Sequence, residues 1–243
     1  MSNLDINLRS NHLLALLEDT TYKRLLNHLQ VVSLRAGHII YEPNETIQNI
    51  YFPCGAMISF VSTMENGATT ETGMVGYEGM VGLPAVWSSR ASTSRAIVQI
   101  GGNAIAVEAG VVKEEFQRGG DFQQILLLYM QAFFAQVSQT SACNRQHATE
   151  ERLCRWLLSV RDCVRRQELP LTQEFVANML GIRRPSVTVA AGLLQQAGTI
   201  RYARGNIALV DESALKTCAC ECYEIIKQEY VKLLGDPQSL KKI

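Results

Sequence analysis

Hydrophobic positions change their spacing several times along the chain. Leucines recur at helical intervals between residues 8 and 29, which predicts a helix there. From residue 31 to about 108, short β-type runs alternate with turn residues. They are Val31–Leu34, His38–Tyr41, Ile47–Phe52, Ala56–Ser62, Thr69–Val75, Ala96–Ile100 and Ala104–Val107. Many short strands with regular turns predict an antiparallel jelly roll, and Asn66-Gly67 favours a type I′ hairpin turn.

Residues 121–146 then predict one long helix. Its apolar positions step by three or four residues: Phe122, Ile125, Leu126, Tyr129, Met130, Phe133, Phe134 and Val137. This stripe can pack on the chain's own sandwich or on the same helix of a second subunit. Its length favours the second arrangement, so we predict a homodimer in which these eight side chains line the interface.

The segment after His147 has the pattern of a winged helix-turn-helix. Thr149 is expected to cap the next helix. Thr172 is then expected to cap a short helix that Gly181 ends, and Pro185 suits the first turn of a second helix at 183–197. Ile200–Tyr202 and Ile207–Val210 flank a predicted hairpin wing. The expected fold class is α+β, with a jelly roll at 1–120, a dimerisation helix at 121–146 and a winged domain at 147–243.

Charge is distributed unevenly, although the net charge is zero. Residues 1–139 contain 8 basic and 12 acidic side chains, whereas residues 140–243 contain 15 and 11. A basic C-terminal part fits a nucleic-acid-binding module. No apolar run is long enough to span a membrane, and the first residues lack a signal-peptide pattern, so we expect a cytoplasmic protein. The sequence contains no nucleotide-binding loop, GxSxG or HExxH motif, so no motif indicates an enzyme.

Seven cysteines, an odd number, argue against a disulfide framework. Three of them, Cys218, Cys220 and Cys222, are close together on an expected terminal helix. Cys218 and Cys222 could bind a soft metal or act as a redox pair, but no histidine lies nearby in the sequence. Small apolar fillers packed on the winged domain are the favoured interpretation, and no metal site is predicted.

Two signatures are present in the chain: Arg35–Glu45 followed by Ile50–Pro53, and Leu171–Gly181 followed by Ser186–Thr188. In this order and at this spacing they resemble the Crp/Fnr family of bacterial transcription regulators. The resemblance implies a cyclic-nucleotide-binding-type jelly roll, a dimerisation helix and a winged helix-turn-helix. Double-stranded DNA, a second subunit and RNA polymerase are the implied partners.

The implied effector pocket departs from the family pattern. Cyclic-nucleotide binders of this fold hold the ribose with a Gly-Glu pair and the phosphate with an Arg-Ser-Ala triplet. Here those positions read Gly79-Met80, followed by Val81, and Ser94-Arg95-Ala96. The carboxylate is missing and Arg95 is displaced by one residue, which in a strand reverses its direction. Tight cAMP binding is not expected, although Arg90 or Arg95 could reach the pocket through a bulge.

Two other sensors of the family are not expected. Only Cys54 precedes residue 140, so the cysteines of an N-terminal iron–sulfur cluster are missing. The scattered His12, His28 and His38 do not indicate haem ligation. The remaining alternatives are an unidentified small-molecule or redox sensor, a constitutive regulator, or a dimeric module that does not bind DNA.

The resemblance places the DNA contacts at the start of the second helix of the motif. Arg184 aligns with an arginine that the family uses to bond guanine, whereas Pro185 and Val189 replace polar readers. Arg183, Ser186 and Thr188 are further contact candidates, and Arg201 and Arg204 on the wing are expected at phosphates. Thr172 belongs to the same predicted surface.

Overall fold

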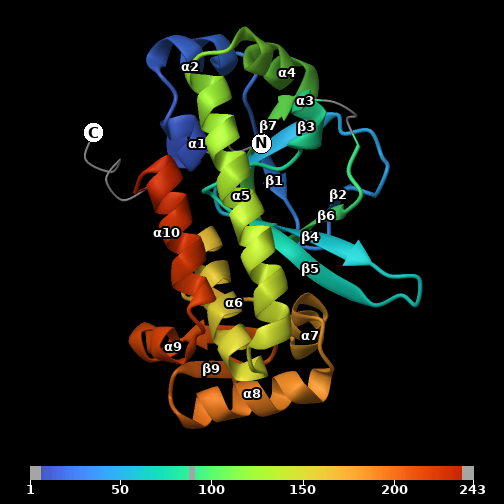
Figure 1. Ribbon diagram of the computed structural model, residues 1–243, viewed down its shortest axis with the longest axis vertical. Helices are drawn as coiled ribbons and strands as arrows, with labels where there is room; N and C mark the ends of the chain where they lie inside the picture. The colour runs from blue at the N-terminus through green and yellow to red at the C-terminus, as the bar shows by residue number, and fades with distance from the viewer. Residues whose placement is uncertain (1–6, 88–90, 237–243) are drawn as a thin grey trace.

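The computed structural model describes residues 7–87 and 91–236. Figure 1 shows an elongated molecule with a β-roll at one end and a small helical domain at the other. The long helix α5 (Asp121–Gln146) runs between them. No helix in the described part of the chain has the length and apolar character needed to cross a membrane.

The N-terminal segment is divided into short helices rather than the single predicted one. They are η1 (Leu8–Ser10), α1 (His12–Ala15) and α2 (Asp19–Leu26). The buried Asn11 explains the first break, because its Oδ1 accepts from the Leu13 amide at 3.0 Å and caps α1. Its Nδ2 donates to the carbonyls of Pro53 and Gly79, so the cap is also joined to the roll.

All seven predicted strands of the roll are confirmed, and no end is shifted by more than two residues. One sheet has the order β1-β7-β3 and the other β2-β6-β4-β5. Their bounds are β1 Gln30–Leu34, β2 Ile39–Tyr41, β3 Asn49–Pro53, β4 Met57–Thr63, β5 Thr69–Val75, β6 Arg95–Ile100 and β7 Gly102–Glu108. Alternating residues of both sheets, among them Ile50, Phe52, Ile58 and Ile105, are fully buried between them.

The hairpin between β4 and β5 does not have the predicted type I′ turn. Gly67 has a φ of 81°, but Asn66 is not among the residues with positive φ. A type I′ turn needs positive φ at both central residues. The Gly67 amide instead donates to the Met64 carbonyl, which gives a longer loop in which only the glycine is left-handed.

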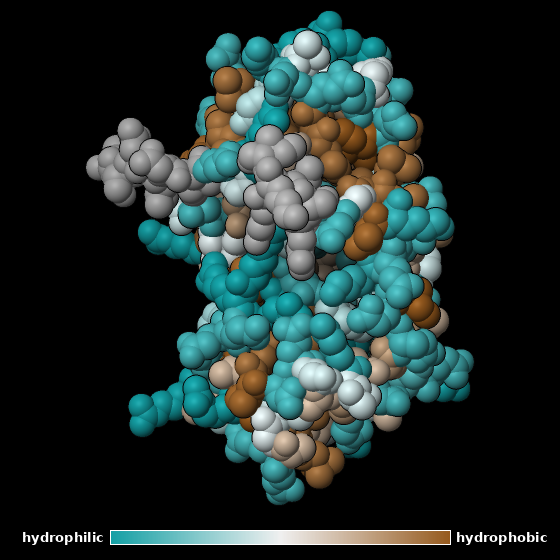
Figure 2. Space-filling model, turned by 90° about the vertical axis from the view of Figure 1, so that its left-hand side faces the viewer, coloured by the Kyte–Doolittle hydropathy of each residue, from teal (hydrophilic) through white to brown (hydrophobic). Residues whose placement is uncertain are grey.

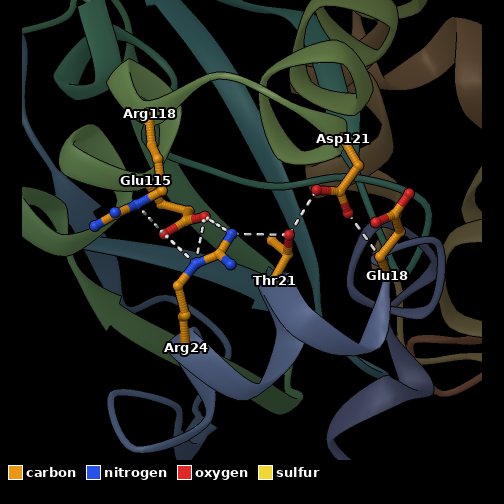
Figure 3. Close-up of polar contacts among 6 residues, drawn as sticks. All are labelled: Glu18, Thr21, Arg24, Glu115, Arg118 and Asp121. Carbon is orange, nitrogen blue, oxygen red and sulfur yellow. Dashed lines mark hydrogen bonds and ion pairs between the residues drawn. The ribbon is translucent and has the colours of Figure 1, made fainter.

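A polar network fixes the start of α5 (Figure 3). The Asp121 carboxylate accepts from the Glu18 amide at 2.8 Å and from the Thr21 hydroxyl at 2.6 Å. Arg24 donates to Thr21 and to Glu115 on α4 (Ala109–Arg118). The network joins α2, α4 and α5 above the roll. Sequence patterning had missed α4 and the short α3 (Pro84–Trp87).

The C-terminal part begins after a break at His147, as predicted. Helix α6 (Thr149–Val164) leads to β8 (Glu168–Leu169), α7 (Gln173–Leu180) and α8 (Arg184–Gln196). The wing strands β9 (Ile200–Ala203) and β10 (Asn206–Leu209) pair with each other, β10 also pairs with β8, and α9 (Glu212–Cys218) follows. Thr149 is not the cap of α6 but its first residue. Glu151 accepts from the Ala148 amide at 2.9 Å and stabilises this end instead.

The last helix, α10 (Cys222–Leu234), returns along α5 toward the roll (Figure 1). The Tyr230 and Tyr129 rings meet edge to face with centroids 6.5 Å apart, and His12 Nε2 lies 3.0 Å from the Leu234 carbonyl. Figure 2 views the molecule from the side on which α10 lies in Figure 1. The middle of this surface is mostly hydrophilic, and hydrophobic residues gather mainly in its upper half. The C-terminal helix therefore packs on α5 with its inner face.

The two ends of the molecule share a continuous packed region. Met57, Val61, Met74 and Ile100 of the roll belong to the same hydrophobic cluster as the buried residues of α6, α7 and α8. Trp156 of α6 is its largest fully buried side chain. The predicted division at residues 120 and 146 therefore stays a prediction, because the packing extends across it.

Candidate nucleic-acid interface

The helix-turn-helix is built as the sequence predicts. The Thr172 hydroxyl accepts from the Phe175 amide at 3.2 Å and caps α7. Gly181 ends this helix with a φ of 62°, and the Ile182 amide returns to the Ala177 carbonyl. Val187, Ala190, Ala191 and Leu194 bury the inner face of α8. The opposite face of α8 is consequently free to contact a ligand.

The outer face of α8 carries most of the predicted contact residues at the end of the molecule farthest from α1 (Figure 1). Arg183, Arg184, Pro185, Thr188 and Val189 are exposed, and Ser186 is half-buried. The helix begins at Arg184, so the positive end of its macrodipole adds to the positive charge of the two arginines. An exposed N-terminal turn with two guanidinium groups is suited to a phosphate backbone and to guanine edges.

One of these side chains forms a hydrogen bond, and another forms a long ion pair. The Thr188 hydroxyl donates to Gln173 Oε1 at 2.8 Å. Arg184 Nη1 lies 4.0 Å from Glu174 Oε2, and both groups are well exposed. So long an exposed ion pair contributes little to stability, and Arg184 can exchange Glu174 for a base at small cost.

The wing presents its two arginines on exposed backbone. Arg204 and Gly205 have φ values of 48° and 75°, so the two-residue turn is of type I′. In the described part of the chain no carboxylate forms an ion pair with Arg183, Arg201 or Arg204. The three guanidinium groups therefore remain available to an anionic partner.

The turn before α8 rests on the roll. A Cβ at Gly181 would lie 2.9 Å from the Thr70 hydroxyl oxygen of β5, and Gln99 Nε2 donates to the Met179 sulfur at 3.4 Å. Arg152 on α6 donates to the Leu180 carbonyl at the end of α7. Contacts from the roll and from α6 thus determine where α8 sits.

A buried carboxyl group, that of Glu71 on β5, joins the roll to α6. Glu71 Oε1 accepts from Trp156 Nε1 at 2.8 Å, and its other oxygen accepts from the Ser59 hydroxyl. Burial raises the pKa of Glu71 to about 7, although both hydrogen bonds and the charge of Arg155 oppose the increase. The carboxyl is consequently held largely protonated below neutral pH.

Glu71→Gln should remove a pH dependence of stability. The folded pKa lies above the unfolded one, so the stabilising effect of the protonated form is complete below about pH 4.5 and lost as pH rises toward 7. From pH 4.5 to 7 the native chain should lose stability that Glu71→Gln keeps. The unfolding free energy of Glu71→Gln minus that of the native chain should therefore increase, by at most about 3 kcal/mol. Urea unfolding at several pH values measures it. A difference that stays constant with pH would contradict the assignment.

Several residues predicted to line the effector pocket are buried against other side chains of the chain. Met80, Val81 and Ala96 are buried, and the Tyr129 hydroxyl donates to the Met80 carbonyl at 2.9 Å. A Cβ at Gly79 would lie 2.5 Å from the Tyr129 hydroxyl oxygen. The half-buried Arg95 donates to Glu42 at 2.8 Å, and Ser94 is half-buried beside it. Arg90 lies outside the described residues.

The predicted apolar stripe of α5 divides into two faces. Phe122, Leu126 and Tyr129 are 2% exposed or less, so these three pack inside their own subunit and cannot contact a second one. Ile125 and Phe133 pack partly on the same core, Phe133 against Phe60. Periodicity missed this division because the roll and α10 cover adjacent sides of α5.

The second face is apolar and uncovered. Leu127, Met130 and Phe134 are 45%, 37% and 72% exposed, and Val137 is half-buried beyond them. Their spacing of three and four residues is that of a coiled-coil seam. Leu127 is not among the predicted interface residues, although its position three residues before Met130 continues the helical spacing of the stripe.

The comparisons with known proteins agree with this geometry. Residues 151–218 match the Crp-like helix-turn-helix domain family. No curated protein matches the chain. Among solved structures, a Crp/Fnr-family regulator from Eubacterium rectale is similar over 83% of this chain and 94% of its own, with a TM-score of 0.65 and 18% identity.

Two further structures have the same architecture. FixK2 from Bradyrhizobium japonicum has a TM-score of 0.67 at 14% identity, covering 79% of this chain and 98% of its own. The regulator CLP from Xanthomonas campestris, described as responsive to c-di-GMP, has a TM-score of 0.62 at 13% identity, covering 79% and 99%. Residues 151–218 thus have the sequence pattern of the Crp-like helix-turn-helix domain. The chain as a whole has the fold of Crp/Fnr-type transcription regulators.

Proposed function

We propose that the protein is a homodimeric transcription regulator that binds a palindromic DNA site. The observation that supports this most directly is the first turn of α8, which exposes Arg183 and Arg184 on a Crp-like helix-turn-helix. In this class of motif the N-terminal residues of the second helix enter the major groove. Arg184 would bond the two acceptors of guanine, and Arg183 a phosphate.

The uncovered face of α5 supports the dimer. Two copies of the seam Leu127, Met130, Phe134 and Val137 would bury each other's exposed apolar surface about a two-fold axis. The dimer would present two α8 helices about one turn of DNA apart, ~34 Å. The predicted contact with RNA polymerase remains a proposal that rests on the resemblance.

Substituting two arginines separately tests the assignment of roles. Arg184→Ala should reduce discrimination at one guanine of each half-site by about 1–3 kcal/mol. Arg204→Ala should instead weaken binding to all sequences alike and reduce the salt dependence by about one phosphate contact. Selection from random DNA identifies the site, and titrations at several salt concentrations compare the variants. Equal losses of discrimination in both variants would contradict these roles, and failure of the native chain to select a sequence would contradict the proposed function.

We also propose that the roll does not bind cAMP tightly. Support comes from Arg95, whose guanidinium is paired with Glu42, and from Met80 and Tyr129, which fill the space beside Gly79. Calorimetric titration with cAMP, cGMP and c-di-GMP should give no micromolar binding. One site per subunit at that affinity would refute this part of the proposal.

A cavity supports a second candidate, the sensing of another small molecule. It has a volume of about 170 Å³ and lies between β5, α5, α6 and α10. Its polar lining includes Tyr77, Arg155, Lys227 and Tyr223. A thermal-shift survey of anionic metabolites distinguishes the candidates, since a ligand that binds the folded state raises its unfolding temperature. A panel without any shift favours constitutive DNA binding.

A further inference from the structure

Four metal-binding side chains from separate parts of the chain meet at the break between α5 and α6. Cys143 and His147 lie one turn apart at the end of α5, and Cys220 and Cys222 lie where α9 gives way to α10. One potential ligand atom from each of these four residues lies within 4.8 Å of the other three. Cys143 and Cys222 are fully buried, Cys220 is almost so, and His147 is half-buried.

This cluster corrects two expectations from the sequence. Cys218 and Cys222 do not share a helix, because α9 ends at Cys218 and α10 begins at Cys222. A histidine does lie beside the cysteines, but it comes from a segment more than 70 residues earlier in the sequence, as His147 Nδ1 lies 3.6 Å from Cys222 Sγ. Only the tertiary structure brings these segments together.

We propose that Cys143, His147, Cys220 and Cys222 form a tetrahedral site for a single zinc ion. Three thiolates and one imidazole are a ligand set of structural zinc sites, in which all four positions are occupied by protein. Zinc bonds of about 2.3 Å to sulfur and 2.0 Å to nitrogen place two sulfurs ~3.8 Å apart, and sulfur and nitrogen ~3.6 Å apart. Two of the observed separations are close to these values: Cys222 to His147 at 3.6 Å matches, and Cys143 to Cys220 at 3.5 Å is about 0.3 Å shorter.

The surroundings of the four side chains fit a bound cation. His147 Nε2 lies 3.2 Å from the Glu221 carboxylate, the partner that a metal-bound imidazole commonly has on its second nitrogen. Gln139 Nε2 donates to the Cys222 sulfur at 3.1 Å, which stabilises a thiolate. Thiolate is the form that binds metal.

Charge also favours the site. Three thiolates and Zn²⁺ leave one negative charge, and the buried Arg152 and Arg155 bring positive charge toward the sulfurs. The spacing favours one ion over an iron–sulfur cluster, because a cluster places its own iron and sulfide atoms between the cysteine sulfurs and holds them farther apart. Zinc binds both soft sulfur and imidazole ligands, and the spacing brings three sulfurs and one imidazole around a single position.

The proposed ion has a structural consequence for the DNA-binding end. It would join the last turn of α5 to the α9–α10 junction, directly beside the break that leads to α6. Arg152, next to the thiols, donates to the Leu180 carbonyl at the turn before α8. Zinc would thereby stabilise the orientation of the winged domain on the dimerisation helix.

Metal content of the full-length, untagged protein tests the proposal. Purified under reducing conditions, it should contain about one zinc per subunit by mass spectrometry. Replacement by Co²⁺ should give the visible bands of tetrahedral coordination together with thiolate-to-cobalt charge transfer. The cobalt spectrum needs no variant, so it remains decisive even if a substitution unfolds the chain. Absence of both zinc and the cobalt spectrum would overturn the site.

Matched variants assign the ligands. Cys143→Ala and Cys222→Ala should lose the metal to a chelator that leaves it on the native protein, whereas Cys218→Ala, outside the cluster, should retain it. His147→Ala should bind zinc at least tenfold more weakly. His147→Cys should restore retention of the metal, and its cobalt form should show added charge transfer from a fourth thiolate. Zinc raises the unfolding temperature only where the ligands are intact. Two results would refute the assignment. One is that Cys222→Ala retains zinc as tightly as Cys218→Ala. The other is that protein purified under reducing conditions contains a Cys143–Cys220 disulfide in place of the metal.

Discussion

Phe134→Glu is expected to convert the proposed dimer into a folded monomer that binds the proposed palindromic site at least a hundredfold more weakly. Phe134 is 72% exposed in one subunit, so a glutamate there has no effect on the subunit's core. In the proposed dimer it would remove about 2 kcal/mol of apolar burial from each subunit and place two like charges close together. A loss of about 4 kcal/mol corresponds to roughly a thousandfold weaker dimer.

Sedimentation and light scattering across a range of concentrations measure this change, with DNA titrations in parallel. Gln124→Glu is the matched control, because Gln124 is also exposed on α5 but lies to one side of the seam. The control should remain dimeric and bind DNA normally. A native protein that is monomeric at micromolar concentration, or a dimeric Phe134→Glu variant, would show that the seam is not the interface.

Trp156→Ala should destabilise the protein by about 3–5 kcal/mol, the range found when a large buried aromatic is removed. The indole is 1% exposed and packs in the cluster that connects the roll to the winged domain. Its loss would leave a cavity and would also remove the donor to Glu71 Oε1. The free energy of urea unfolding measures the effect, and a change below about 1 kcal/mol would contradict the role given to this contact.

Trp156→Phe separates the two causes. Phenylalanine retains most of the apolar volume but cannot donate to Glu71, and an unpaired buried acceptor costs about 1–3 kcal/mol. This variant should therefore fall between the native chain and Trp156→Ala. Its stability should also decline more steeply with rising pH, since Glu71 loses a hydrogen bond that stabilises its ionised form.

Local signals predicted most of the elements. The strands of the roll were recognisable as short runs of β-forming residues between turn residues, as in Thr69–Val75, whose bounds the structure reproduces. Helix α7 was recognisable from Thr172 and Gly181, whose capping roles depend only on residues within the helix ends. These features need no knowledge of the tertiary structure.

Features that depend on distant segments were not predictable in this way. The stripe on α5 has a single period, yet Tyr129 faces the roll and α10 while Phe134 faces outward, and only the arrangement of neighbouring elements divides them. His147 and Cys222 are 75 positions apart, so no spacing motif connects them. Glu71 and Trp156 are joined only after the winged domain packs on the roll.

The return of α10 to the roll has a consequence for genetics. A nonsense mutation after the wing would leave the DNA-reading helix-turn-helix complete, but it would delete the helix that packs on Tyr129 and reaches His12. Such alleles should produce unstable protein and behave as recessive loss-of-function mutations. Missense alleles confined to the first turn of α8 should instead leave the proposed dimer intact, so mixed dimers with one defective half would make these alleles dominant.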